Sequence, residues 1–292
     1  MDGLNRANLF KYFDRCRMRD GGYCYFHDPE SGAGFSNVAD TYWVLTSYQL
    51  AKKNPPFVSK TGSWLRREFD QNKTTHFFPY LFWLLGGLRL AGVPIPKEGH
   101  HCLIQETGRL LDDWTSRTEI PTLLDDLVAA VFLRRKLSLP LSEKEKECLG
   151  DLLDQNSDRP GPRPLPELWA RGFLMEESGR FSRTAIAADQ ELEQQYRHPS
   201  FGYVLVPGSS RSDLFVLRSG LSMRSELLAP SEVRNLTNLL LSSQSRGGGC
   251  GPIGGAVPTL EATCAALEIS RLFANFSSLY EELMAKQKGI SS

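Results

Sequence analysis

The chain has 292 residues, of which 41% are hydrophobic and 23% are charged, and this length is sufficient for a large core within one domain. Its 34 basic and 34 acidic residues cancel to a formal charge of zero, whereas nucleic-acid-binding proteins normally carry a basic surplus. The charge balance therefore argues against a nucleic-acid partner.

Membrane insertion and secretion are also not expected from the sequence. The most apolar run, residues 77–88, has about half of the roughly 20 residues that a membrane-spanning helix needs. The first residues, MDGLNRANLF, lack the apolar segment of a signal peptide, and the six cysteines lack the spacing of a disulfide framework. We therefore expect a cytoplasmic protein with reduced thiols.

Helix and turn signals follow one another in pairs along the chain. Each pair has an amphipathic helix, a connection rich in Gly or Pro, and a second helix that is more uniformly apolar. The predicted pairs are 4–17 with 38–52, 57–70 with 75–90, 102–114 with 123–137, 143–155 with 167–176, 185–196 with 213–222, and 231–243 with 260–273. A loop is predicted at 197–212 and a tail helix at 277–286.

The second helices are expected to form an inner ring because they are the more apolar members of the pairs. An open solenoid of such pairs would need polar capping repeats at its ends, and the sequence does not show them. The predicted fold is therefore all-α: an α6/α6 toroid, formed by a single domain over residues 1–292, with an apolar cavity along its axis.

One pattern occurs near both ends of the chain. The segment GGYCYF followed by NVADTYWVLTSYQL, within residues 17–53, has the same order of parts as RGGGCGPIGGAVPTLEATCAALEISRL at 246–272. This pattern resembles the repeat of protein prenyltransferase β subunits and of squalene and class II terpene cyclases. The resemblance implies a closed barrel that holds an isoprenoid or polyene chain, with glycines that serve the turn between paired helices.

The cyclase branch of this resemblance implies a catalytic acid. In class II cyclases the middle carboxyl of an Asp-x-Asp-Asp motif protonates an alkene, and aromatic faces stabilise the resulting cation. The segment PTLLDDLVAAVFLRR at 121–135 is similar to that motif, with Leu123 in place of the first Asp. The resemblance makes Asp125 the acid and Asp126 its neighbour, provided that burial and a nearby like charge keep Asp125 protonated.

A structural interpretation of the same acids stays open. Acidic residues stabilise the first turn of any helix by about 0.3–1 kcal/mol through the helix dipole. Other predicted inner helices carry such residues at Asp40, Glu167, Asp213 and Glu261. Capping would therefore explain Asp125 and Asp126 without catalysis.

Aromatic residues recur on the predicted inner helices, where one stripe of each helix faces the axis. The residues expected to line the cavity are Tyr42, Trp43, His76, Phe77, Tyr80, Trp83, Trp169, Phe173 and Phe215. Such a surface suits a long apolar ligand, although core packing would use the same residue types. Basic residues on or beside these helices, which would meet a diphosphate or be solvated, are Arg134, Arg135, Arg171, Arg211 and Arg218.

The prenyltransferase branch implies a zinc ion and a helical-repeat partner subunit. In that family, Asp and Cys two residues apart on a late inner helix and His on the last one hold the zinc. Asp14 and Cys16 have this spacing but lie on the first outer helix, and Cys24 with His27 would complete only an irregular site. We therefore expect no metal and no cofactor.

Together these patterns predict an isoprenoid-active protein, a metal-free, acid-initiated cyclase or isomerase with Asp125 as proton donor. Two alternatives stay open: a transferase like the prenyltransferase β subunits, with a helical protein partner, and a non-catalytic toroid that binds a lipid or a protein.

Overall fold

The computed structural model of the protein describes residues 4–26, 35–72, 78–116, 121–155, 162–180, 194–200, 202–223 and 230–273. Helices dominate these residues, and strands are limited there to two short segments and isolated bridges. None of the described helices is both long and apolar enough to span a lipid bilayer. The prediction of a fold built from helices is confirmed.

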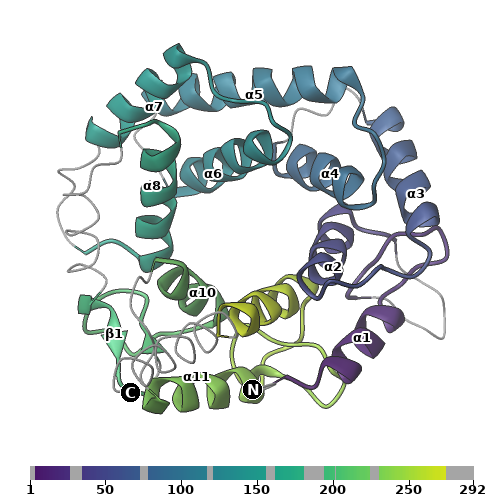
Figure 1. Cartoon of the computed structure of the whole chain (residues 1–292), viewed down its shortest axis with the longest axis vertical. Coiled ribbons are helices and arrows are strands. Elements are labelled where there is room, and N and C mark those ends of the chain that lie inside the picture. Colours follow the sequence, from purple (N-terminus) through teal and green to yellow (C-terminus); the bar gives the residue numbers. More distant parts are fainter. Residues whose placement is uncertain are drawn as a thin grey trace, which may run out of the picture.

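The helices alternate between an outer and an inner position around a common centre (Figure 1). The outer helices are α1 (Arg6–Arg15), α3 (Val58–Gln71), α5 (Lys97–Ser116), α7 (Glu143–Gln155) and α11 (Pro230–Ser243). The inner helices are α2 (Val38–Leu50), α4 (Phe78–Leu90), α6 (Pro121–Lys136), α8 (Leu165–Glu177), α10 (Leu214–Met223) and a last helix over residues 260–273. The predicted helices at 185–196 and 277–286 lie outside the described residues, apart from 194–196.

Contacts between successive helices build the ring. Inner helix α2 packs on α4, α4 on α6, α6 on α8 and α8 on α10, while α3, α5 and α7 cover α4, α6 and α8 from outside. The predicted loop at 197–212 contains a small antiparallel hairpin of β1 (Arg197–His198) and β2 (Gly202–Tyr203), and β2 packs on α10. Helix α5 begins at Lys97 rather than at residue 102, since Pro96 precedes its first turn and Glu98 lies within it.

The two repeated segments fold in the same way. In the first, Thr41 Oγ1 accepts a hydrogen bond from the Tyr23 amide (3.0 Å) and donates one to the Asn37 carbonyl (2.7 Å). In the second, Thr263 Oγ1 accepts from the Cys250 amide (2.9 Å) and donates to the carbonyl at 259 (2.6 Å). In each segment, a threonine hydroxyl thus links the glycine-rich turn to the start of the inner helix that follows it.

Each of these turns also packs against the outer helix of the next pair. Gly21 has a φ of +111° and approaches α3, where a Cβ would lie 2.8 Å from the Lys60 carbonyl oxygen. Gly248 has a φ of +98° and approaches α1, where a Cβ would lie 2.0 Å from the Asn8 carbonyl oxygen. Only glycine combines such a φ with such a close approach, so the last pair contacts the first as the first contacts the second.

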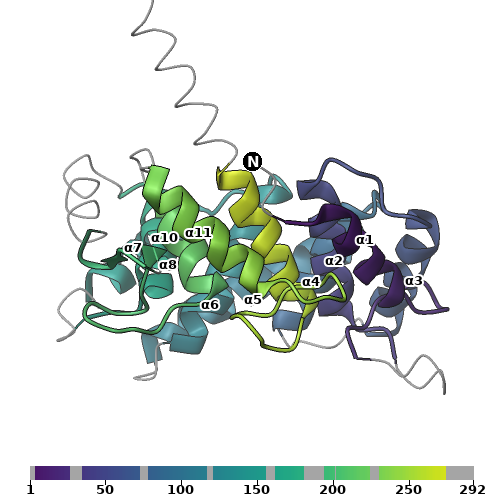
Figure 2. The same ribbon diagram turned by 90° about the horizontal axis from the view of Figure 1, so that it is seen from below.

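Hydrogen bonds join the first and last pairs along this seam, where α1 and the last helix lie near each other in both views (Figures 1 and 2). The Asn5 amide donates to Gln244 Oε1 (2.9 Å), and Gln244 Nε2 donates back to the Asn5 carbonyl (3.1 Å). Tyr12 donates its hydroxyl proton to the Pro258 carbonyl (3.2 Å), and Arg15 donates to the Gly247 carbonyl. The described helices therefore form a closed ring.

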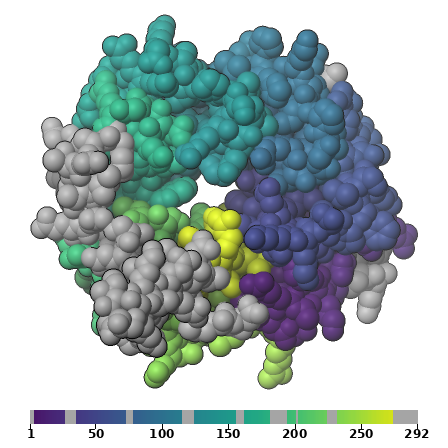
Figure 3. Space-filling model, in the orientation of Figure 1, coloured from purple at the N-terminus to yellow at the C-terminus, as the bar shows by residue number. Residues whose placement is uncertain are grey.

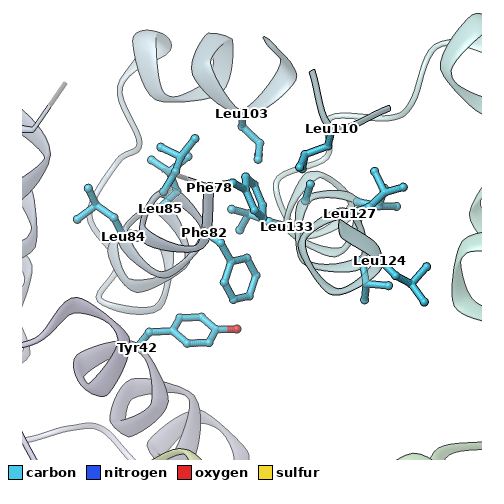
Figure 4. Close-up of a cluster of buried hydrophobic side chains, with 14 of the residues drawn as sticks. Tyr42, Phe78, Phe82, Leu84, Leu85, Leu103, Leu110, Leu124, Leu127 and Leu133 are labelled. Atoms are coloured by element: carbon cyan, nitrogen blue, oxygen red, sulfur yellow. The ribbon is translucent and has the colours of Figure 1, made fainter. Parts of the chain in front are cut away.

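Buried apolar side chains between the inner and outer helices form two core clusters. One spans α2 to α8 and includes Phe78, Leu85 and Leu127, which lie between α4, α5 and α6 (Figure 4). The other joins α1, α2, α10, α11 and the last helix. Trp43 packs against both clusters, so one continuous core holds the inner helices around the centre.

Candidate functional site

A hollow lies in the middle of the molecule, between α2, α6 and the helix over 260–273 on the face that Figure 3 shows. Such a space remains because the side chains of each inner helix contact the neighbouring inner helices rather than the helices on the opposite side of the axis. We take this hollow as the candidate site, and it is where the sequence predicted the ligand to bind.

Carboxyl groups from different inner helices gather in two neighbourhoods at the helix starts. The charge of Glu261 on the last helix contributes to a raised pKa of Asp40 on α2, and the charge of Glu167 on α8 contributes to a raised pKa of Asp125 on α6. Burial raises the pKa of Glu261, and the charge of Arg218 opposes this rise. Acids that the sequence predicted as helix caps therefore also lie near acids of other inner helices.

The predicted acid, Asp125, lies on the inner helix α6, within the electrostatic influence of Glu167 on α8 and Arg218 on α10. Its side chain is exposed to solvent, yet surrounding protein raises its pKa through burial, and the charge of Glu167 adds to this effect while Arg218 opposes it. Glu167 itself is held by Arg163, with 2.9 Å between Nη1 and Oε1. Asp125 is therefore a carboxyl group that water reaches and whose protonated form the surroundings favour.

Asp126 lies on another side of α6. Burial and the neighbouring Asp125 raise its pKa, and Arg109 of the outer helix α5 lowers it. Asp126 is therefore influenced by a charge on an outer helix, whereas the charges that influence Asp125 belong to inner helices.

Aromatic side chains form two groups on the inner helices. Tyr42 of α2 has its ring 5.0 Å from that of Phe82 on α4 and 4.9 Å from that of Trp43 (Figure 4). Across the ring, Trp169 of α8 stacks on Phe173 with 6.2 Å between centroids. The structure therefore brings four of the predicted aromatic residues into two contacting groups.

The remaining predicted residues are distributed differently. Tyr80 lies on the outer side of α4, since its hydroxyl donates to Glu68 of α3 (3.2 Å) and accepts from Asn72 (3.2 Å). Trp83 is half-buried against the core cluster, and Phe215 lies on α10 beside Arg218. His76 and Phe77 lie outside the described residues.

Tyr42 adds a hydroxyl group to one of these two aromatic groups. Its ring packs over Gly86 of α4, where a Cβ would lie 2.7 Å from the ring. Burial raises the pKa of its hydroxyl, and the nearby Cys264 and Glu268 of the last helix add to this effect. A hydrogen bond with the Thr46 side chain opposes this rise, and the hydroxyl stays protonated near neutral pH.

Sequence reasoning missed the roles of Arg218 and Glu268. The Nη1 atom of Arg218 on α10 lies 3.7 Å from Oε2 of Glu268 on the last helix. In the sequence Arg218 is one of several basic residues near inner helices, and Glu268 stands in the middle of an apolar run, EATCAALEISRL. A charged residue within so apolar a helix was the signal that could have identified Glu268.

Metal ligation finds no support in the described residues, where no group of three or more His, Cys, Asp or Glu side chains could hold an ion. Burial raises the pKa of the Cys16 thiol to about 12, so it is a neutral thiol near Tyr12. Cys24 directs its Sγ to the Phe26 carbonyl (3.0 Å), and burial raises its pKa as well. His27 lies outside the described residues.

Asp40 is expected to contribute to the pH dependence of stability. Burial, with a smaller effect from Glu261, raises its pKa to about 6 in spite of the hydrogen bond from the Tyr25 amide (3.1 Å). An unfolded Asp titrates near 3.9, so the native state binds the extra proton between about pH 4 and 6 and stability decreases as pH rises through that window. Asp40→Asn should flatten this slope in urea unfolding measured from pH 4 to 7.

Asp14→Asn, which changes an exposed carboxyl on α1, is the matched control and should leave the slope as in the wild type. An unchanged slope in Asp40→Asn would contradict the assignment.

No protein-family model matches the chain, and a comparison with curated proteins finds no match.

Proposed function

We propose that the protein is an α6/α6 toroid of the terpene cyclase and prenyltransferase type that binds an isoprenoid chain in its hollow and converts it by protonation. The observation that carries this proposal is Asp125, a carboxyl group on the inner helix α6 whose pKa is raised by burial and by Glu167 of the inner helix α8. The ring of paired helices and the twice-repeated glycine-rich turn support the fold assignment.

Protonation requires the acid form of Asp125 at the moment of reaction. Glu167 and burial already favour that form, and an apolar ligand that displaced water from the exposed carboxyl would raise its pKa further. The carboxyl proton then passes to one alkene carbon, whose π electrons form the new C–H bond. This step leaves an Asp125 carboxylate and a carbocation on the neighbouring carbon.

Aromatic groups near the hollow would stabilise the positive charge. The Tyr42 and Phe82 rings lie on one side and the Trp169 and Phe173 rings on another, and π faces attract cations. A second double bond of the same chain would supply the electrons that close a ring. Loss of a proton from a neighbouring carbon to a carboxylate or to water would then end the reaction without any net redox change.

A second candidate follows from the exposure of Asp125. A carboxyl in contact with water is mostly ionised near neutral pH unless a ligand excludes that water. A toroid that binds its ligand without converting it would not need a protonated Asp125. In that case the hollow would bind a ligand, and no protonation or cyclisation would follow.

Product analysis tests the two candidates. The purified protein is incubated with squalene, geranylgeranyl diphosphate and related polyenes in D₂O, and products are extracted and analysed by gas chromatography and mass spectrometry. We expect a cyclised or isomerised product with one deuterium from the wild type and at least 100-fold less product from Asp125→Asn. Asp112→Asn, which changes an exposed carboxyl on the outer helix α5, should match the wild type.

Equal product from wild type and Asp125→Asn would remove Asp125 from the reaction. Retention of a polyene in native mass spectrometry, without product from any substrate, would favour the binding candidate. If no polyene is bound or converted, the hollow is not an isoprenoid site.

A further inference from the structure

Arg218 of α10 lies near charged and polar groups of several inner helices. Its charge opposes the rise in pKa that burial causes at Asp125 of α6, at Tyr42 of α2 and at Glu261 of the last helix. Helix α10 packs mainly on α8, and α2 and α6 lie beyond its ring neighbours in Figure 1. Only a side chain that points across the ring approaches groups on both sides at once.

The guanidinium of Arg218 donates no hydrogen bond to any residue that the structure describes, although its side chain is only 27% exposed. Its ion-pair distance to Glu268, 3.7 Å, is too long for a hydrogen bond, and its Cζ lies 5.8 Å from the Phe215 ring centroid. The described part of the protein therefore does not use the five N–H donors of this group.

Other partly buried arginines near the inner helices are used differently. Arg163 donates to Glu167 (2.9 Å), and Arg171 donates to the Leu153 carbonyl (2.6 Å). Both are held by the protein itself, whereas the donors of Arg218 are available to a molecule in the hollow. An acceptor on that molecule would form a charge-assisted hydrogen bond, which is stronger than one between neutral groups.

The surroundings of Arg218 limit the charge of that acceptor. The Glu268 carboxylate already lies opposite the one positive charge of Arg218, and the carboxyl groups of Asp125 and Glu261 supply no positive charge. A diphosphate would bring two or more further negative charges that Arg218 alone could not balance. An uncharged oxygen would bring no such charge, and the protonated hydroxyl of Tyr42 is a second donor for it.

We propose that Arg218 anchors the ligand through one uncharged oxygen, a hydroxyl or a carbonyl at the end of the apolar chain. The substrate class is then an isoprenoid alcohol or carbonyl compound rather than a diphosphate ester. This inference rests on the proposed function, because it requires an isoprenoid chain in the hollow. Arg218 is a binding residue in this arrangement, and Asp125 stays free for the alkene.

Binding measurements test the anchor independently of catalysis. The probes are geranylgeraniol, the hydrocarbon with the same carbon skeleton, and geranylgeranyl diphosphate, each titrated against tryptophan fluorescence in the same detergent. We expect the wild type to bind the alcohol about 10- to 100-fold more tightly than the hydrocarbon or the diphosphate. Arg218→Met should lose this preference while its affinity for the hydrocarbon stays the same.

Arg218→Lys, which keeps a charged donor, should retain part of the preference. Arg234→Met, an exposed arginine on the outer helix α11, should behave like the wild type. The preference of the wild type among the three probes needs no variant, so the anchor is tested even if Arg218→Met does not fold.

Two kinds of failure are distinguishable. Equal wild-type affinity for hydrocarbon and alcohol, tighter binding of the diphosphate, or an unchanged preference in a folded Arg218→Met would each overturn the anchor and leave a ligand in the hollow. Binding of none of the three probes would overturn the proposed function, and the anchor with it.

Discussion

Gly248→Ala is expected to destabilise the protein by about 3–5 kcal/mol, because it combines backbone strain with a steric clash. The φ of +98° is unfavourable for alanine, and the new Cβ would lie 2.0 Å from the Asn8 carbonyl oxygen. Since both atoms involved are close to rigid backbone, either the turn or α1 must move. Urea unfolding followed by circular dichroism measures the change in the free energy of unfolding.

Gly255→Ala is the matched control for this substitution. Gly255 lies in the same connection with a φ of +78°, but a Cβ there would meet no atom within 4 Å. Only the backbone strain remains, so we expect a loss of about 1–2 kcal/mol. Equal losses in the two variants would show that the close packing of the turn on α1 contributes nothing to stability.

Arg134→Ala should destabilise the protein by a similar amount, about 3–5 kcal/mol, because it breaks a buried ion pair. The Arg134 side chain is 4% exposed and donates to Glu145 Oε1 (2.5 Å) and to the carbonyls of Leu139 (3.1 Å) and Pro140 (2.6 Å). Without it, Glu145 keeps, among the residues that the structure describes, its hydrogen bonds from Ser142, and the loop between α6 and α7 loses its central donor.

The adjacent Arg135 is the control, since its side chain is 53% exposed and pairs with Glu177 at 2.8 Å. Exposed pairs contribute about 0–1 kcal/mol, so Arg135→Ala should have a small effect on thermal or urea unfolding. A loss below about 1 kcal/mol in Arg134→Ala would mean that its contacts do not hold this loop.

Local patterns in the sequence account for most of the helices that the structure describes. Apolar periodicity and Gly or Pro signals are properties of neighbouring residues, and the ranges predicted for α2, α3, α4 and α7 agree closely with the observed ones. The start of α5 was missed because Gly99 and the two histidines after it resemble a loop. The two glycine-rich turns could be recognised in the sequence for the same reason, because their pattern is formed by neighbouring residues.

The candidate site was less predictable because it depends on how distant helices are oriented. Helical periodicity does not determine which face of α4 carries Tyr80, and the hydrogen bond to Glu68 shows that this residue faces α3. The effect of Glu261 on Asp40, and that of Arg218 on Asp125, exist only once distant helices have packed together. The spacing of residues along the chain does not predict these contacts between distant helices.

The seam between the first and last pairs has a consequence for the order of folding. The hydrogen bonds between Asn5 and Gln244 join residues 239 positions apart, whereas Thr61 bonds to the carbonyl of Gly21 across only 40. Because a longer loop loses more chain entropy when its ends meet, contacts within and between neighbouring pairs form early and the seam forms late. Contacts that are absent from the transition state govern the rate of unfolding rather than that of folding, so the seam sets how long the closed ring persists.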